Sequence, residues 1–518
     1  VLGATLVDMY AKCGLLDKAQ GVFEQLPVRN VVSWTALMSG YIKHDLGHET
    51  LKCFEKMLGE GISPDIITYI CVLKACALVG SLEVGENIAV EVRKQGLLQK
   101  DLVLGATLVD MYAKCGALEK ARDVFDHLPK QNVVSWTALI GGYVQHGFGN
   151  EALKCFKEMK DEGISPNAVT YTCILQACAI VGCLDIGKDI DVEVRNKGLL
   201  QKEIVLGTAL VDMYAKCGAL AKAQEVFDKL SIQTVASWNA LISGYSFYGL
   251  DDDCLNCFVK MQETGLSPNA ITFTYLLKAC GNLGSVEMGD KMHTDASKAG
   301  LLENNSLLVT ALMDMYAKCG VLGKAEEVFQ QLSIRDAVSW TALITGYAQL
   351  GRIQTVFLAF KRMIAEGIIP DAITFVALLN ACNHAGLVEE GQCFFNTMTN
   401  IYLISPTSEH YTCMVDLFGR AGHFDKAVEV IVKMPSSHYF LVWDALLGAC
   451  QKWGNVQLGR FAFEQKVQLD PNNGAAYVLM SNIYVAAGLK EDAEKIEVMQ
   501  SKLCCSKQCM VHQVHGWI

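Results

Sequence analysis

The apolar residues of this chain recur at helical spacing, in pairs of short segments separated by turn residues. Residues 102–132 show the arrangement, with Gly116 ending one segment and Pro129 the next. Each segment carries an apolar face at positions i, i+3, i+4 and i+7: Leu108, Met111, Tyr112 and Cys115, then Ala121, Val124, Phe125 and Leu128. This periodicity predicts two amphipathic helices joined by a short turn.

These helical pairs belong to an internal repeat of 102 residues. The string "MYAKCG" stands at 9–14, 111–116, 213–218 and 315–320. Units that start at "VVSWTAL" (31), at "IITYICVLKAC" (66) and at 102 divide the period into 35, 36 and 31 residues. Because two short helices cannot bury both apolar faces alone, the units must stack on one another. The predicted fold class is therefore all-α, an α-solenoid superhelix of stacked helix-turn-helix repeats with a concave and a convex surface.

Composition and charge narrow the class of protein. Of the 518 residues 51% are hydrophobic, 19% are charged and 9 are prolines, as in a mostly helical chain with a large apolar interior. The net charge of −11 argues mildly against a simple nucleic-acid binder, although a basic stripe on one face would be compatible with it. There is no run of eighteen apolar residues, so no membrane segment is expected. The sequence begins as the interior of later copies does, and we expect any signal or transit peptide to lie outside it.

The 21 cysteines fall mostly on repeat positions. We expect the cysteines of "AKCG" and of the later "AC" strings to pack in the core of a protein from a reducing compartment: Cys13, Cys115, Cys217 and Cys319, then Cys76, Cys178, Cys280, Cys382 and Cys450. Cys254 and Cys257 form a Cys-x-x-Cys pair, but Cys257 matches packing positions in other units. A C-terminal cluster fits no common metal-ligand spacing, and no metal or cofactor is expected: Cys504, Cys505, Cys509, His512 and His515.

The three unit types carry recognisable strings. The "VVSWTALMSGY", "VLKAC" and "LVDMYAKCG" units resemble the P, L and S motifs of plant pentatricopeptide repeat proteins of the PLS subclass. The resemblance covers residues 1–439, with the first motif incomplete, while residues 440–473 and 474–507 resemble the two E motifs of organellar RNA editing factors and 508–518 a degraded tail. It implies binding of single-stranded organellar RNA in a mitochondrion or chloroplast, with one nucleotide per motif.

Editing factors of that family often end in a zinc deaminase domain of the DYW type. Such a domain needs a His-x-Glu string and a Pro-Cys-x-x-Cys string to hold the metal and activate its water, and neither occurs in this sequence. We therefore expect a protein that is not itself an enzyme. A deaminase or other editing factor would act in trans through the E motifs.

In the resembling family the fifth and last residues of each motif read one base, as splayed RNA bases require. For the P motifs these residues are Thr35 with Asp65, Thr137 with Asn167, Asn239 with Asn269, and Thr341 with Asp371. For the S motifs they are Ala4 with Asn30, Ala106 with Asn132, Thr208 with Thr234, Thr310 with Asp336, and Thr412 with Tyr439. The family code implies guanine for Thr-Asp, adenine for Thr-Asn and a pyrimidine for Asn-Asn. Ala4, Ala106 and Tyr439 imply weak selection.

Three further sets of positions repeat along the chain. L motifs carry Ile70, Thr172, Thr274 and Val376 at the fifth position and are expected to act mainly as spacers. Apolar second residues either sandwich bases or only pack between helices: Val32, Val134, Ile271 and Val338. Cations follow the ends of the S-motif helices and are expected to contact RNA phosphates, although they would also complement the helix dipole: Lys12, Lys114, Lys216, Lys318 and Arg420.

Three functions fit these observations. The first is site recognition for C-to-U RNA editing with the deaminase supplied in trans. The second is an organellar RNA splicing or stability factor, which would need the repeat array but not the tail. The third is a protein-binding helical scaffold, which would not need variable polar residues at two positions in otherwise similar units.

Overall fold

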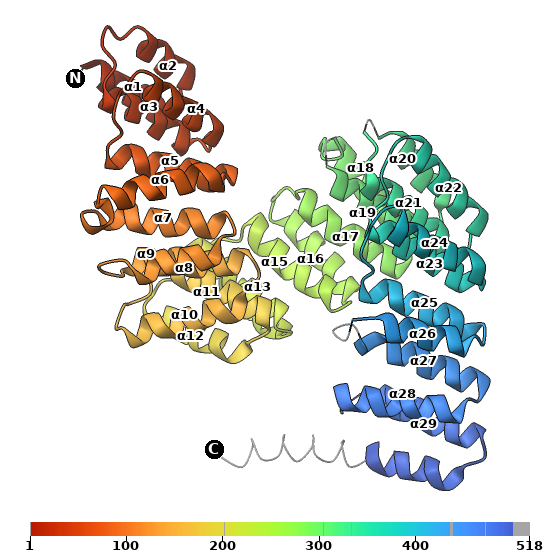
Figure 1. Cartoon of the computed structure of the whole chain (residues 1–518). Helices are drawn as coiled ribbons and strands as arrows, with labels where there is room; N and C mark the ends of the chain where they lie inside the picture. The colour runs from red at the N-terminus through yellow and green to blue at the C-terminus, as the bar shows by residue number, and fades with distance from the viewer. Residues whose placement is uncertain are drawn as a thin grey trace. The chain divides into compact units, whose positions relative to one another are not determined.

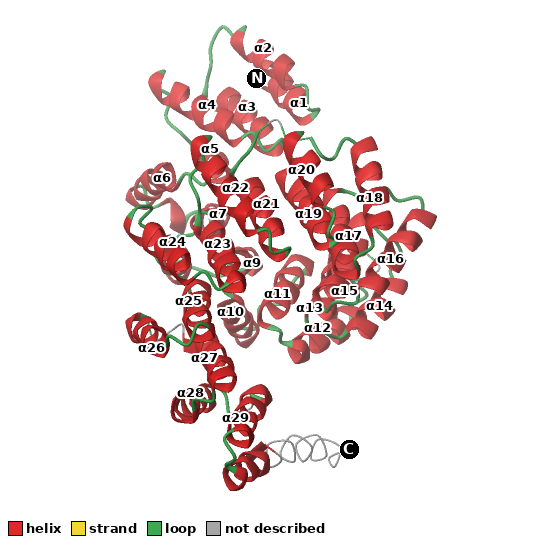
Figure 2. Ribbon diagram, turned by 90° about the vertical axis from the view of Figure 1, so that its right-hand side faces the viewer, coloured by secondary structure: helices red, strands yellow, loops and turns green. Residues whose placement is uncertain are grey.

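The computed structural model describes residues 2–500, except 201, 304, 333, 436–438 and 472; for 439 and 440 it describes the backbone alone. Figure 2 shows that every regular element of these residues is a helix. The chain forms two compact units, residues 1–267 and 268–518. The predicted all-α fold of stacked helical pairs is confirmed.

The first unit consists of helical pairs in chain order (Figure 1). The first helices of its pairs are α1 (Leu2–Lys12), α3 (Val31–Lys43), α5 (Ile66–Val79), α7 (Leu102–Lys114), α9 (Val133–Gln145), α11 (Ala168–Val181), α13 (Ile204–Lys216) and α15 (Val235–Phe247). The second helices are α2 (Leu16–Glu24), α4 (Gly47–Gly59), α6 (Leu82–Lys94), α8 (Leu118–Asp126), α10 (Gly149–Asp161), α12 (Leu184–Asn196), α14 (Leu220–Asp228) and α16 (Asp251–Glu263). A short 3-10 helix, η1 (Leu97–Gln99), follows α6.

The second unit repeats this order. Its first helices are α17 (Ala270–Leu283), α19 (Ser306–Lys318), α21 (Ala337–Gln349), α23 (Ala372–Ala385), α25 (Ser408–Arg420), α27 (Tyr439–Trp453) and α29 (Gly474–Ala486). Its second helices are α18 (Val286–Lys298), α20 (Leu322–Gln330), α22 (Ile353–Ala365), α24 (Val388–Asn400), α26 (Phe424–Lys433) and α28 (Val456–Leu469), and residues 490–500 are also helical.

Within each unit the first helices pack directly on one another, as α7 does on α5 and α9. Each second helix fills the angle between its own first helix and the next, as α8 does between α7 and α9. The close approach of first helices depends on small residues. A side-chain carbon added at Gly142 would overlap with Ala113 Cβ and lie 3.2 Å from its Cα. The glycine–alanine contact repeats at Gly40, Gly244 and Gly346.

The repeated strings predicted the ends of these helices. The glycine of "MYAKCG" has φ of +79° at Gly116, a backbone conformation that favours glycine and lets the chain reverse into α8. The repeated tryptophan is buried and packs its helical pair against the preceding pair. Trp136 contacts Phe125 edge to face, with 4.5 Å between ring centroids. The same contact recurs at Trp34, Trp238 and Trp340.

Candidate nucleic-acid interface

The fifth and last residues of the P motifs are brought together where one helical pair meets the next. The fifth residues lie one turn inside α3, α9, α15 and α21, and the last residues are the N-caps of α5, α11, α17 and α23. Asp65 Oδ1 accepts a hydrogen bond from the Thr68 N–H at 2.8 Å, which holds the carboxylate at the start of α5. The helix start therefore places each last residue beside the first helix that carries its partner.

A third residue joins the two side chains. Thr68 is fully buried, and its Oγ1 donates to Asp65 Oδ1 at 2.7 Å and lies 2.9 Å from Thr35 Oγ1. The same connection recurs in the second unit, where Thr374 lies between Thr341 and Asp371. In both Thr-Asp motifs the pair expected to read one base is thus part of one hydrogen-bonded group.

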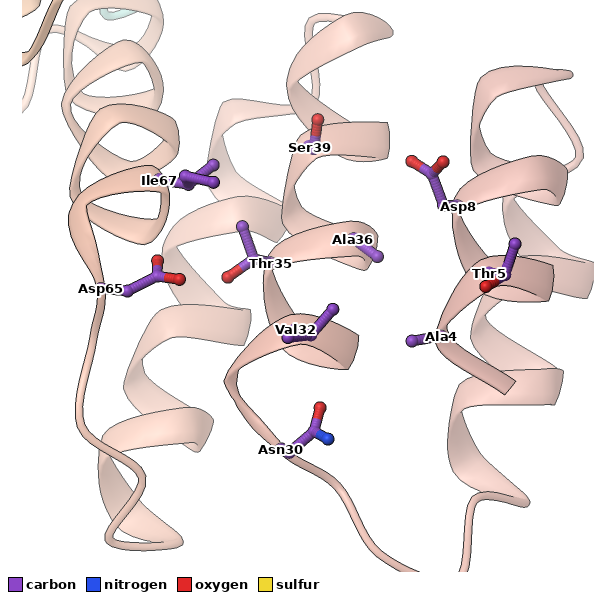
Figure 3. A pocket seen from close by; sticks show the side chains of 10 residues that line it. All are labelled: Ala4, Thr5, Asp8, Asn30, Val32, Thr35, Ala36, Ser39, Asp65 and Ile67. Carbon is purple, nitrogen blue, oxygen red and sulfur yellow. The ribbon is translucent and has the colours of Figure 1, made fainter. Parts of the chain in front are cut away.

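Thr35 and Asp65 line an open cavity of ≈ 420 Å³ between α1, α3 and α5. Figure 3 shows the two side chains next to each other, with Val32 and Ile67 on the same surface. In the second unit a cavity of ≈ 320 Å³ is lined by residues three periods later in the chain, including Thr341 and Asp371. Both Asp-terminated P motifs therefore present their pair to an open cavity.

Apolar side chains border the same surface. Val32 and Ile67 are each 59% exposed, and Val338 and Ile373 are 49% and 66% exposed. Packing between helices does not account for side chains with so much of their area in solvent. Because bases have apolar faces, flanking aliphatic side chains suit a base held between neighbouring repeats.

The S-motif residues are arranged differently. Their last residues are also N-caps, of α3, α9, α15 and α21: Asn30, Asn132, Thr234 and Asp336. Their fifth residues are the apolar Ala4 and Ala106 or threonines that donate to a carbonyl of their own helix: Thr208, Thr310 and Thr412. At these junctions the third residue of the following P motif is serine. The Ser33 hydroxyl donates to the backbone oxygen of Asn30 rather than to the Asn30 side chain.

The last S motif departs from the predicted boundary. Helix α27 begins at Tyr439, whereas residue 440 is predicted as the start of the first E motif and Tyr439 as the last residue of the preceding motif. Helix ends shift by a residue or two without change of fold. The Tyr439 side chain lies outside the described residues, as do the tail 508–518 and the C-terminal cysteine and histidine cluster.

The repeated cations are all paired within their own helices. Lys12, Lys114, Lys216, Lys318 and Arg420 each contact the aspartate four residues earlier, at 2.7–2.9 Å. The "DMYAK" string carries this i,i+4 pattern, which the sequence interpretation overlooked. These pairs are half-exposed, and such surface pairs contribute only about 0.2–1 kcal/mol, so a phosphate can compete for the cation.

Two groups of cysteines differ in burial. The "AC" thiols are buried, and burial raises the pKa of Cys76, Cys178, Cys382 and Cys450 to about 12. The "AKCG" cysteines follow helix ends and are only partly covered at Cys115, Cys217 and Cys319, so their expected core position is wrong; Cys13 is exposed. Cys254 and Cys257 are buried, and burial raises the Cys257 pKa to about 12, in keeping with a packing role.

The described part of the chain holds no group of three or more histidine, cysteine or acidic side chains placed to bind a metal. None of its helices is both long enough and apolar enough to cross a membrane.

Comparison with known proteins gives matches along most of the chain. The model described as "PPR repeat family" matches residues 29–77, 131–180, 233–282 and 335–384, and "PPR repeat" matches 5–31, 107–133, 208–231, 308–335, 373–401 and 409–439. The model described as "E motif" matches residues 453–507.

Two relatives come from Arabidopsis thaliana. A pentatricopeptide repeat-containing protein named as mitochondrial is 35% identical over 97% of this chain and 73% of its own length. One named as chloroplastic is 36% identical over 99% of this chain and 64% of its own length. Among solved structures, the maize pentatricopeptide repeat protein PPR10 is 17% identical over 97% of this chain and 84% of PPR10, with a TM-score of 0.47, and its complex with an 18-nt psaJ RNA element gives 0.48.

Proposed function

The chain belongs to the family of pentatricopeptide repeat proteins and carries an E motif, and from that premise we propose that it binds single-stranded organellar RNA sequence-specifically. The observation that carries the proposal is the convergence of Thr35 and Asp65 on an open cavity, repeated by Thr341 and Asp371. Both cavities are bordered by exposed aliphatic side chains on which a base can stack.

Each P motif would read one base of the target. Thr-Asp pairs favour guanine opposite motifs 31–65 and 337–371, and Thr310 with Asp336 favours a further guanine. Thr137 with Asn167 favours adenine, and Asn239 with Asn269 a pyrimidine. Motifs 306–336 and 337–371 are consecutive, so the target contains two adjacent guanines. If the last S motif lies at the fourth nucleotide upstream of the edited cytidine, these guanines occupy the sixth and seventh positions.

We assign the chain to site recognition for C-to-U editing in a mitochondrion or chloroplast. The E motif supports this assignment, because it resembles the segment that follows the last S motif in editing factors. In this proposal a DYW-type deaminase or another editing factor is recruited in trans, which accords with the lack of zinc-deaminase strings in residues 1–518. Residues 440–507 are the proposed recruiting segment.

The test compares two single-stranded RNAs at one salt concentration. One carries the predicted bases, and in the other the two adjacent guanines are replaced by pyrimidines. We expect a loss of affinity of at least about tenfold for the second RNA, since each good base contact is worth about 1–3 kcal/mol. Equal binding of both RNAs, or of neither, would contradict sequence-specific recognition.

A second experiment separates editing from splicing or stability. The chain is mixed with a DYW-type deaminase and an RNA that carries a cytidine four nucleotides downstream of the base opposite the last S motif. We expect conversion of that cytidine to uridine only when both proteins are present. RNA binding without conversion would favour a splicing or stability role.

A further inference from the structure

Thr68 is the buried threonine between the Thr35 and Asp65 side chains, and it limits how these two side chains can form hydrogen bonds. A hydroxyl group carries one proton and two lone pairs, whereas a carboxylate only accepts. The Thr68 hydroxyl donates to Asp65 Oδ1 at 2.7 Å and accepts from the Asp65 N–H at 3.4 Å. Its proton is therefore committed to the carboxylate.

The contact between the two threonines then has a fixed direction. Thr35 Oγ1 lies 2.9 Å from Thr68 Oγ1, and with the Thr68 proton already used, Thr35 must be the donor. The Thr35 oxygen is left with a lone pair for the cavity, and the second carboxylate oxygen of Asp65 is also an acceptor. The pair presents acceptors only.

The second unit shows the same arrangement around Thr374. Its hydroxyl donates to Asp371 Oδ1 at 2.7 Å, accepts from the Asp371 N–H at 3.2 Å, and lies 2.7 Å from Thr341 Oγ1. Thr35 and Thr341 are both buried, 8% and 6% exposed, as expected for hydroxyls turned toward a buried partner.

The Asn-terminated motif differs in the number of contacts that share the two hydroxyl protons. Thr137 Oγ1 lies 2.8 Å from Thr170 Oγ1, as in the Asp-terminated motifs, but it also lies 2.6 Å from the Val133 carbonyl, which can only accept. Thr170 Oγ1 lies 3.0 Å from Asn167 Oδ1, so three contacts share two protons and the direction of the bond between the threonines is not fixed. The Thr170 N–H donates to Asn167 Oδ1 at 2.9 Å. The amide oxygen is occupied, and the Asn167 NH₂ group is the part left to meet a base.

We infer that Thr68 and Thr374, the third residues of the L motifs, determine base specificity in the preceding P motifs by fixing the direction of the hydroxyl proton. The inference rests on the proposed RNA-binding function. An edge of acceptors matches the adjacent N1–H and N2–H₂ donors of guanine and repels the N1 lone pair of adenine. Thr68 and Thr374 are positioning residues, because they lie behind the reading pair and act on the base through it.

The experiment uses two RNAs that differ only in the nucleotide opposite motif 337–371, guanine in one and adenine in the other. For the unsubstituted chain we expect a preference for guanine of about tenfold, equivalent to about 1.4 kcal/mol. Thr374→Val keeps the shape of the side chain but removes its hydroxyl, which leaves Thr341 free to donate or accept. We expect the preference to fall below about threefold, chiefly because affinity for the adenine RNA rises once Thr341 can donate to the adenine N1 lone pair. Thr374→Ser should restore it.

Ser339→Ala is the matched control. Ser339 is also a third residue and its hydroxyl also caps a helix, but it donates to the backbone oxygen of Asp336 at 3.0 Å and not to a reading side chain. We expect the control to keep the guanine preference at the nucleotide opposite motif 337–371. Far-ultraviolet circular dichroism on heating checks that each variant is folded. If Thr374→Val does not fold, Thr68→Val is tested with guanine or adenine opposite motif 31–65.

The outcomes separate the two proposals. An unsubstituted chain that binds neither RNA contradicts the proposed function. If it binds both RNAs but does not prefer guanine, or if a folded Thr374→Val or Thr68→Val variant keeps the full preference, the role of the buried threonines is wrong.

Discussion

The first and second helices of the repeats are held to their neighbours by different physical means. First helices pack directly on one another through small residues such as Gly142 and Ala113. Second helices are linked to the next second helix by ion pairs, as Arg122 of α8 is to Glu158 of α10 at 3.0 Å and Lys160 of α10 is to Glu193 of α12 at 2.9 Å. Disruption of the small-residue contacts between first helices should therefore cost far more stability than loss of an ion pair between second helices.

The first and second helices also differ in the proposed functional residues that they carry. Every proposed base-reading residue lies on a first helix or at its N-cap, where close packing holds its position. The ion pairs between second helices, such as Arg122–Glu158 and Lys160–Glu193, are only partly buried, and such pairs contribute little to stability individually. Rigid spacing of the reading residues suits recognition of successive bases, because a fixed register has to be kept along the RNA.

The largest expected effect comes from Gly142→Val. The added side chain would overlap with Ala113 on α7, and overpacking against backbone should lower the free energy of unfolding by about 2–3 kcal/mol. The adjacent Gly141 is the control, since a side-chain carbon there would make an ordinary contact with Cys173 Sγ at 3.7 Å. Gly141→Ala should raise the free energy of unfolding by about 0.5–1 kcal/mol. Equal urea midpoints for the two variants would refute the close-packing account.

Asp371→Ala should show the next largest effect, on both stability and binding. It removes the N-cap of α23, at a cost of about 1 kcal/mol, and one reading side chain, with a loss of about tenfold in affinity for guanine-bearing RNA. Asp101→Ala is the control, because Asp101 caps α7 through the Val103 and Leu104 N–H groups at the end of an L motif. It should lose similar stability but keep the affinity. A parallel loss of affinity in both variants would mean that capping, not base reading, explains the effect.

The N-caps of the first helices show what the sequence could and could not predict. The repeat strings predicted the first residue of almost every first helix, because periodicity and turn residues are local signals. Asn30 followed by Ser33, and Asp65 followed by Thr68, also formed a visible capping signature that the sequence interpretation did not use. The bond from Thr35 to Thr68 was beyond it, since it joins residues 33 apart through packing of two first helices.

Substitution of an S-motif cation should have a smaller effect, on the salt dependence of RNA binding. Lys114→Gln should reduce the slope of log affinity against log salt concentration by about 0.7, the value for one phosphate contact on a single strand. The control is Lys120→Gln on the second helix α8, where Lys120 pairs with Glu86 of α6. That variant should keep both the affinity and the slope. If Lys114→Gln leaves the slope unchanged, Lys114 serves only its pair with Asp110.

The smallest effect should be a pH dependence at the start of α25, where a titratable side chain stands in a capping position on a first helix. His410 is fully buried; its Nδ1 faces the Thr407 N–H at 3.1 Å, and its Nε2 lies 2.9 Å from the Ala372 carbonyl. Burial lowers the pKa of His410, outweighing the opposite effects of the Ala372 hydrogen bond and the nearby Glu409.

The sign of the effect follows from that lowered pKa. The folded chain binds the His410 proton less readily than the unfolded chain, whose histidine pKa is about 6.5. The stability that His410 contributes is therefore complete above about pH 6.5 and is lost as pH falls toward the pKa of the folded chain.

Glutamine also fits this helix position but does not titrate in this range, so His410→Gln should show a smaller fall in urea midpoint between pH 7.5 and 5.5. The control is His127→Gln, at an exposed position after α8, whose urea midpoint should fall as much as that of the unsubstituted chain. If the urea midpoint of His410→Gln falls as far as that of the unsubstituted chain, the pH dependence arises elsewhere. The stability at this first-helix position is then no more sensitive to pH than at the second helices.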